Sequence, residues 1–177
     1  MNLKYSIPNK LYWIDNFLDY NTYKNIHNSI FRERKQINFY STENVWGKFL
    51  YKNLVPPMKT EINGYKPIES LITLLKHNPY FTLDELKEVS VNIHYMQKGA
   101  GVNWHNDGKW KYGVTYYINH RWSENSGGEF MFTDKEGHSW IPVLGNSLVL
   151  VKAPLQHKVN PVLNPFIPRI SIQIFMK

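Results

Sequence analysis

A period of two in the hydrophobic residues of the second half of the chain constrains the fold more than any other feature. In "EVSVNIHYMQ" (88–97) it places one apolar face on an extended strand, formed by Val89, Val91, Ile93 and Tyr95. "RISIQIFM" (169–176) alternates in the same way. Three more β-rich runs lie between these two, separated by short turn signals: "GVTYYIN" (113–119), "GEFMFT" (128–133) and "NSLVLVK" (146–152). Many short strands joined by turns predict a β sandwich or barrel.

The first half of the chain has a different period. Residues 15–35 carry apolar side chains at helical spacing, and Asp19 or Asn21 is suited to cap the start of that helix. A second helix is expected over residues 67–77, where Pro67 occupies the first turn. We therefore expect helices first and strands afterwards.

Length and composition fit one globular domain. The 177 residues are 42% hydrophobic and 20% charged, which allows a sizeable core and argues against disorder. The predicted fold is mostly β with N-terminal helices around a double-stranded β-helix (jelly-roll, cupin-like) core. Within the single domain 1–177, residues 1–87 are expected to form helical support and rim, and residues 88–177 the catalytic β core.

Several classes of protein are disfavoured by what the sequence lacks. There is no cysteine, which excludes disulfides, thiolate zinc sites, iron–sulfur clusters and cysteine nucleophiles, so any metal must bind His and carboxylate side chains. The N-terminus has no apolar leader and no run of 18 apolar residues exists, so a cytoplasmic protein without membrane contact is expected. The net charge of +7 is interpreted as a Lys-rich surface, because the basic residues are scattered; nucleic acid is not the expected partner.

The tripeptide His105-Asn106-Asp107 places an imidazole and a carboxylate two residues apart, just before Gly108. In an extended segment such residues project to the same face, so both can point at one ion. His157, which follows the run "NSLVLVK", is a candidate third ligand. Either element alone is usually a surface turn or a structural histidine. Together, two imidazoles and one carboxylate on a β framework are the ligand set of non-haem Fe(II) oxygenases, which leaves coordination positions open.

Arg169 opens the last predicted strand, 12 residues after His157. An arginine that points into a β barrel needs a carboxylate partner, and guanidinium binds carboxylate in bidentate fashion. The alternative is an ordinary surface arginine on an edge strand.

From Tyr95 to Phe175 the sequence resembles the prolyl 4-hydroxylase-like branch of the Fe(II)/2-oxoglutarate dioxygenases. The resemblance rests on "Y-x3-G-x5-H-x-D", "YYIN-x2-W-x4-GGEF", "P-x3-N-x-L-V", "H-x-V-x-P" and "R-x-S-I". It implies that His105, Asp107 and His157 bind iron and that Arg169 binds the C5 carboxylate of 2-oxoglutarate. It further assigns Tyr117 and Tyr95 to the cosubstrate pocket, and Ser171 is a candidate helper of Arg169.

The sequence departs from the family pattern at three places. Val102 stands where a tyrosine is common, and Gln173 where a small hydroxyl residue is often found. The spacing from His157 to Arg169 is also longer by a few residues. These departures bear on the 2-oxoglutarate pocket and not on the metal ligands.

Aromatic and polar residues near the ligands in sequence are candidates for substrate contact: Trp104, Asn106, Trp110 and Trp122. Trp104 and Asn106 are equally suited to orient the ligands, and the segment "GKWKYG" (108–113) to be a solvated loop.

The resemblance implies a hydroxylase that uses Fe(II), with 2-oxoglutarate and O2 as cosubstrates and ascorbate as a supportive reductant. It favours a prolyl residue of a protein or peptide as the substrate. Hydroxylation of a free amino acid or other small metabolite stays open. So does a non-oxidative cupin-like binding or sugar-epimerising protein, because one β framework supports many functions.

Overall fold

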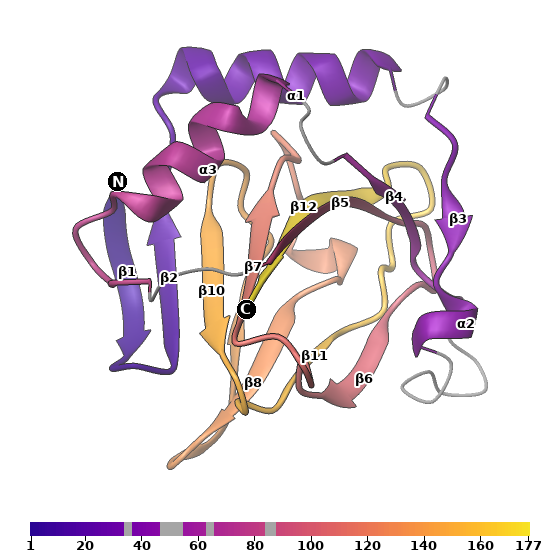
Figure 1. Cartoon of the computed structure of the whole chain (residues 1–177). Helices are drawn as coiled ribbons and strands as arrows, with labels where there is room; N and C mark the ends of the chain where they lie inside the picture. Colours follow the sequence, from indigo (N-terminus) through magenta and orange to yellow (C-terminus); the bar gives the residue numbers. More distant parts are fainter. Residues whose placement is uncertain (34–36, 47–54, 63–65, 84–87) are drawn as a thin grey trace.

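Two antiparallel sheets form the core of the computed structural model, which describes residues 1–33, 37–46, 55–62, 66–83 and 88–177 (Figure 1). The larger sheet has eight strands in the order β1 (Asn2–Ile7), β2 (Leu11–Asp15), β10 (Leu148–Lys152), β7 (Tyr112–Tyr117), β12 (Arg169–Met176), β5 (Val89–Met96), β4 (Met58–Glu61) and β3 (Tyr40–Ser41). The smaller sheet has four, in the order β6 (Val102–His105), β11 (His157–Val159), β8 (Phe130–Asp134) and β9 (Gly137–Ile141). The predicted jelly-roll class is confirmed.

Two helices cover the outer face of the larger sheet, namely α1 (Tyr20–Glu33) and α3 (Glu69–Lys76) (Figure 1). Helix α1 buries Tyr23, Ile26 and Ile30 at helical spacing, and α3 buries Leu71 and Leu75. The short helix α2 (Glu43–Trp46) and two 3-10 turns, η2 (Lys66–Ile68) and η3 (Glu124–Ser126), complete the described helical elements.

Strand alternation divides the side chains of the larger sheet between two environments. In β12, Ile170, Ile172 and Ile174 pack in the cluster under the helices. Arg169 and Gln173, on the other face, line a pocket between the sheets. The period of two in the sequence therefore separates the structural face of the sheet from the face that carries the site.

The predicted elements are found at or close to their expected positions. The five β-rich runs correspond to β5, β7, β8, β10 and β12. Helix α1 begins at Tyr20, and the carboxylate of Asp19 accepts a hydrogen bond from the backbone N–H of Thr22 at 3.0 Å, so Asp19 is the residue that caps the helix. Residues 34 and 35 of the predicted helix lie outside the described residues.

Residues 1–87, expected to form helical support and rim, also contribute four strands. Strands β1 and β2 form a hairpin that extends the larger sheet beside β10, and β3 and β4 extend its other edge. In β1, Leu3, Tyr5 and Ile7 alternate with polar residues, but Leu3 and Tyr5 are exposed, so this short apolar face is not one that the core buries. Strands β6 and β11 are only four and three residues long, too short for periodicity to identify.

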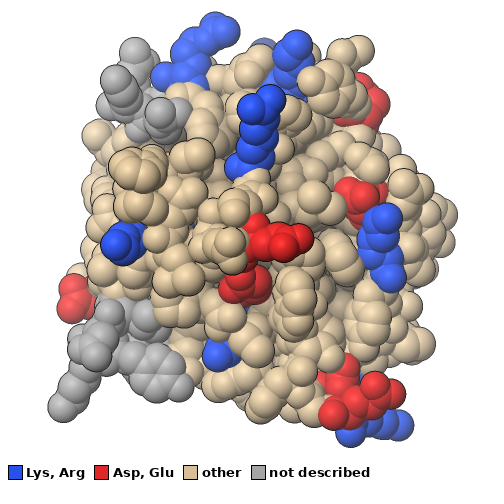
Figure 2. Space-filling view, turned by 180° about the vertical axis from the view of Figure 1, so that it is seen from behind, with Lys and Arg blue, Asp and Glu red and all other residues tan. Residues whose placement is uncertain are grey.

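None of the described helices is long and apolar enough to cross a bilayer. On the face of the molecule in Figure 2, Lys and Arg side chains lie dispersed among acidic and uncharged residues and do not form one basic patch. This distribution agrees with the interpretation of the net charge as a general surface property.

Asn146 joins the helical layer to the sheet. Its side-chain oxygen accepts hydrogen bonds from the Leu18 backbone N–H at 3.0 Å and from the Tyr116 hydroxyl at 2.9 Å. Its amide donates to the Leu18 carbonyl at 2.9 Å. The residue is buried and has a φ of 62°, a conformation that asparagine adopts more readily than other residues with a side chain. One side chain thus fixes the segment that leads into α1 against β7 and β10.

Replacing Asn146 by Ala should strongly destabilise the protein, because it leaves three buried polar groups unpaired. Each such group costs about 1–3 kcal/mol, so we expect the free energy of unfolding to fall by at least about 3 kcal/mol in urea denaturation. The control is Asn9→Ala, at an exposed residue with a similar φ of 60°, which should cost about 1 kcal/mol for the backbone alone. Equal losses in the two variants would contradict the role given to the side chain.

Candidate metal centre

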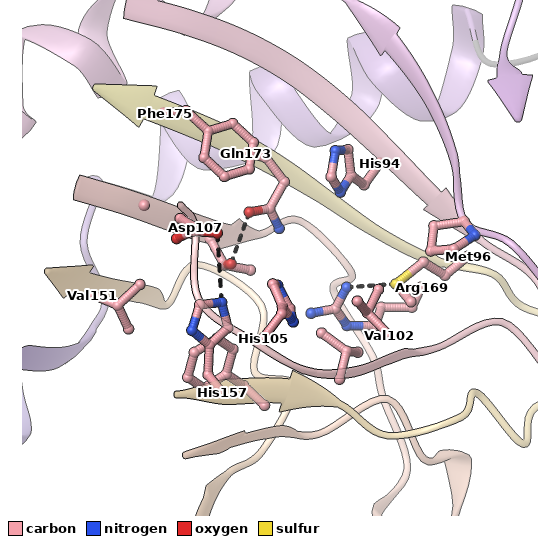
Figure 3. A pocket seen from close by; sticks show the side chains of 15 residues that line it. His94, Met96, Val102, His105, Asp107, Val151, His157, Arg169, Gln173 and Phe175 are labelled. Atoms are coloured by element: carbon pink, nitrogen blue, oxygen red, sulfur yellow. Dashed lines mark hydrogen bonds and ion pairs between the residues drawn. The ribbon is translucent and has the colours of Figure 1, made fainter. Parts of the chain in front are cut away.

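Two short strands bring the three predicted ligands together. His105 ends β6, Asp107 follows in the turn, and His157 begins β11, where it pairs directly with His105. One potential ligand atom from each side chain lies within 4.8 Å of the other two. Nε2 of His157 is 3.6 Å from Oδ1 of Asp107. Figure 3 shows the three side chains converging at one end of the pocket, with the guanidinium of Arg169 pointing toward them.

Hydrogen bonds to the backbone set the orientation of both imidazoles. Nδ1 of His105 lies 2.7 Å from the carbonyl oxygen of Asn103, and Nδ1 of His157 lies 3.0 Å from that of Leu155. A carbonyl oxygen only accepts, so Nδ1 carries the proton in each ring and Nε2 presents a lone pair. This is the arrangement in which histidine binds a metal.

Burial keeps the two rings neutral. It lowers the pKa of His157 to about 4, and it lowers the pKa of His105, to which the neighbouring His157 contributes. Burial also raises the pKa of Asp107, while His105 opposes that shift. Protons therefore compete little with a metal for the imidazoles at neutral pH. Two neutral imidazoles and one carboxylate fit Fe(II).

Gly113 and Asn106, which are not among the three predicted ligands, shape the turn that carries Asp107. Gly113 on β7 lies so close to Asp107 that a Cβ atom there would collide with the carboxylate oxygen Oδ2. Asn106 accepts a hydrogen bond from the Gly108 backbone N–H at 3.0 Å, so its side chain closes the turn. Of the two roles considered for Asn106, this contact favours orientation of the ligands.

Arg169 is buried, with 1% of its surface exposed, and it makes no ion pair among the described residues. Its Nη1 donates to the sulfur of Met96 at 3.0 Å and to Oγ of Ser171 at 3.4 Å, and its Nε and Nη2 have no hydrogen-bond acceptor in the described part of the chain. A buried guanidinium with unpaired N–H groups is costly unless an anion completes it.

The neighbours of Arg169 form a polar strip along the pocket. The guanidinium lies 4.9 Å from the ring centre of Tyr117, whose buried hydroxyl has no acceptor among the described residues. Burial raises the pKa of Tyr117, and the charge of Arg169 opposes this. Gln173 donates to Ser171 at 3.2 Å and accepts from Thr115 at 2.9 Å. Ser171 accepts from both Arg169 and Gln173, so the hydroxyls of Ser171 and Tyr117 are two further donors beside the guanidinium.

Asn119 fixes the start of the strand that carries Arg169. Its side-chain oxygen accepts from the Ile170 backbone N–H at 2.8 Å, and its amide donates to the Pro168 carbonyl at 2.9 Å. Gly128, with a φ of 79°, leaves room for the arginine, because a Cβ there would lie 2.8 Å from Cδ of Arg169. Neither role follows from the sequence, although both residues belong to quoted motifs.

Tyr95 does not lie in the pocket. It packs with the cluster under the helices, and its ring centre is 5.2 Å from that of Phe39. His94 and Met96, its neighbours on β5, line the pocket instead. The period of two places Tyr95 on the same face as Ile93, which points away from the metal-binding cluster. The expected contact of Tyr95 with the cosubstrate is therefore not found. Sequence reasoning missed His94, in which burial and Arg169 lower the pKa to about 3.

The three tryptophans proposed to contact substrate occupy different places. Trp110 packs on Phe175, which lines the pocket, with ring centres 5.8 Å apart. Trp104 stacks on His138 at 4.9 Å. Trp122 lines a separate groove on the outer face of the smaller sheet. Trp110 is linked to the metal pocket through Phe175, and Trp122 also packs against the buried cluster that includes Met96 and Val102 of the pocket lining.

Comparisons with known proteins agree with the site. Residues 91–177 match the family model of the 2OG-Fe(II) oxygenase superfamily. A search of curated protein sequences found no match.

Similar solved structures share the fold at low sequence identity. A prolyl hydroxylase from Trichoplax adhaerens, in complex with a hypoxia inducible factor peptide, is 17% identical with a TM-score of 0.75, over 96% of this chain and 84% of that one. A Pseudomonas putida prolyl-4-hydroxylase is 12% identical with a TM-score of 0.73, over 96% and 93%. The alpha ketoglutarate dependent epimerase SnoN from nogalamycin biosynthesis is 8% identical with a TM-score of 0.72, over 96% and 78%.

The matched segment contains Arg169 and all three members of the His-Asp-His cluster. Such proteins use Fe(II), 2-oxoglutarate and O2. Through residues 91–177, the chain is similar to the 2OG-Fe(II) oxygenase superfamily.

Proposed function

We propose that the chain is an Fe(II)- and 2-oxoglutarate-dependent hydroxylase whose substrate is a prolyl residue of a protein or peptide. His105, Asp107 and His157 hold the iron. Arg169 holds the distal carboxylate of 2-oxoglutarate, with Tyr117 and Ser171 beside it. The observation that carries the proposal is the buried guanidinium, unpaired with any described carboxylate and directed toward the metal-binding cluster.

Bound Fe(II), with 2-oxoglutarate and O2, supplies the oxidising power for inserting oxygen into a C–H bond. The chain's own residues supply position. Arg169 fixes one end of the dicarboxylate by charge-assisted hydrogen bonds. The walls of the pocket include Val102, Phe130, Val151 and Phe175, which exclude water around the reacting atoms.

Met96 acts as a placeholder for the cosubstrate. Its thioether is a weak acceptor, so a carboxylate displaces it from Nη1 of Arg169. The pocket has only about 40 Å³ of free volume, so Met96 has to swing aside even for 2-oxoglutarate. Methionine has the flexible, unbranched side chain that such a movement needs.

The small pocket also bears on the substrate. Because little space remains beside 2-oxoglutarate, the substrate contacts the rim and presents one group to the metal. Trp110 lies at this rim against Phe175, with the ammonium groups of Lys109 and Lys177 each 5.0 Å from its ring centre. An extended peptide with a proline fits this arrangement, and two of the similar structures are prolyl hydroxylases.

Replacing Asp107 by Ala should remove metal binding and turnover. We expect Fe(II) or Mn(II) affinity, measured anaerobically by calorimetry, to fall by about 100-fold or more, since even partners of the ligands are worth 10–100-fold. The exposed carboxylate Glu136, replaced by Ala, is the control and should leave affinity unchanged. Tight metal binding by Asp107→Ala would remove this residue from the site.

Replacing Arg169 by Met should weaken the binding of 2-oxoglutarate without destabilising the ligand-free protein. The Kd of 2-oxoglutarate, measured with Mn(II) in place of Fe(II), should rise by about 10- to 150-fold, which corresponds to about 1.5–3 kcal/mol for hydrogen bonds to a charged group. The ligand-free protein should be equally stable or more stable, because an apolar side chain replaces an unpaired buried charge. The exposed Arg121, replaced by Met, is the control. Loss of stability with unchanged 2-oxoglutarate affinity would make Arg169 a structural residue.

The substrate is tested with Fe(II), ascorbate, 2-oxoglutarate and a library of proline-containing peptides. Hydroxylation is expected as a gain of one oxygen by mass spectrometry, with succinate formed in equal amount. Turnover of free amino acids or other metabolites, with none of any peptide, would overturn the prolyl assignment. A change of stereochemistry without a gain of mass would indicate an epimerase.

A further inference from the structure

A second groove lies on the outer face of the smaller sheet, opposite the metal pocket. In β8, Phe130 and Phe132 pack inside the sandwich, whereas Met131 between them points outward into the groove. Trp140 on β9, directly opposite Met131, points the same way. The groove has a volume of about 750 Å³. The helices α1 and α3 lie on the other sheet, so they do not cover this face (Figure 1).

Large apolar side chains form part of the groove wall. Trp140 is 63% exposed and Leu144 is 40% exposed, and the two side chains line one groove, so both are accessible to a partner. Trp122 is held in place, because its Nε1 donates to the Gly127 carbonyl at 2.9 Å. Pro142 lies between these side chains in the lining. The groove is thus a preformed surface with two indole rings.

The charge of the groove differs from that of the whole chain. The protein has 21 Lys and Arg against 14 Asp and Glu, yet the described lining contains Glu124 and Glu129 and no basic side chain. Asn160 donates to one carboxylate oxygen of Glu129 at 3.2 Å, which leaves the other oxygen for a ligand. Lys158 is the cross-strand neighbour of Met131, but its ammonium lies 5.3 Å from the ring centre of Trp104, outside the lining.

We propose that this groove binds a basic, proline-containing segment of a partner protein. Grooves lined by aromatic side chains bind extended proline-rich segments, which lose little entropy on binding. Lysine or arginine next to the prolines would pair with Glu124 and Glu129 and lie over the exposed indole of Trp140. A second copy of the chain is the alternative occupant, and the sedimentation measurement below distinguishes it from a peptide.

The proposal does not depend on the chemistry of the metal pocket. If the same partner also supplies the hydroxylated residue, binding on the outer face would raise its concentration at the metal site. Binding is therefore measured with EDTA present, so that a failure of the proposed hydroxylation leaves this test intact.

The test uses the full chain and fluorescently labelled proline-rich peptides in polarisation titrations. One peptide carries arginines beside the prolines, a second carries glutamates there, and a third has alanine in place of proline. We expect the arginine peptide to bind at least tenfold more tightly than the other two. Trp140→Ala and Glu129→Gln should each weaken it at least tenfold, since central aromatic and charged contacts dominate such interfaces. Phe166→Ala, at a residue 90% exposed outside the groove, is the control.

Each other outcome overturns the proposal. Equal binding of the arginine and glutamate peptides would remove the charge argument. Binding that Trp140→Ala leaves unchanged would place the peptide elsewhere, for example at the metal rim. Dimers in analytical ultracentrifugation that Trp140→Ala abolishes would assign the groove to a second copy. If none of the peptides binds at millimolar concentration, the groove does not bind a basic, proline-containing segment.

Discussion

The buried guanidinium of Arg169 is the constraint on which the rest of the site depends. An ionised group inside a β sandwich is tolerated only when the surrounding structure holds it in place and a counter-charge completes it. Asn119 fixes the start of the strand that carries Arg169, and Gly128 leaves space for the aliphatic part of its side chain. The sulfur of Met96 accepts a hydrogen bond from Nη1 of the guanidinium. The described residues thus prepare a cationic site and leave the anion to be supplied by a ligand.

Alternation along the strands explains why much of this was predictable. The period of two identified five strands and separated the core face of β12 from the face with Arg169. The ligand types of His105, Asp107 and His157 identified an iron site before their proximity was known. Strand β6 is too short for periodicity to identify, and the alternating apolar residues of β1 are a weak signal over so few positions. Tyr95 was misplaced because motif spacing was preferred to alternation, which also hid His94 and Met96.

The two faces of the smaller sheet carry different sets of side chains. Its inner face carries His157 and stacks Phe130 on that ring at 5.0 Å, so the imidazole is packed and buried. Its outer face presents Trp140 and Met131 to solvent. Trp122 belongs to the outer surface, although it is close to the ligands in sequence, because the chain passes through η3 before it enters β8. Distance in sequence from the HxD motif was therefore a poor guide to contact with substrate.

The most direct test of the account compares 2-oxoglutarate with 2-oxopentanoate, which keeps the keto acid but lacks the distal carboxylate. Calorimetry with Mn(II) on the native chain and on Arg169→Met isolates the contact between guanidinium and carboxylate as a double-mutant cycle. The account predicts that the native protein prefers 2-oxoglutarate by about 1.5–3 kcal/mol and that the variant loses this preference. The same preference in both proteins would contradict it, since the carboxylate would then be bound by residues other than Arg169.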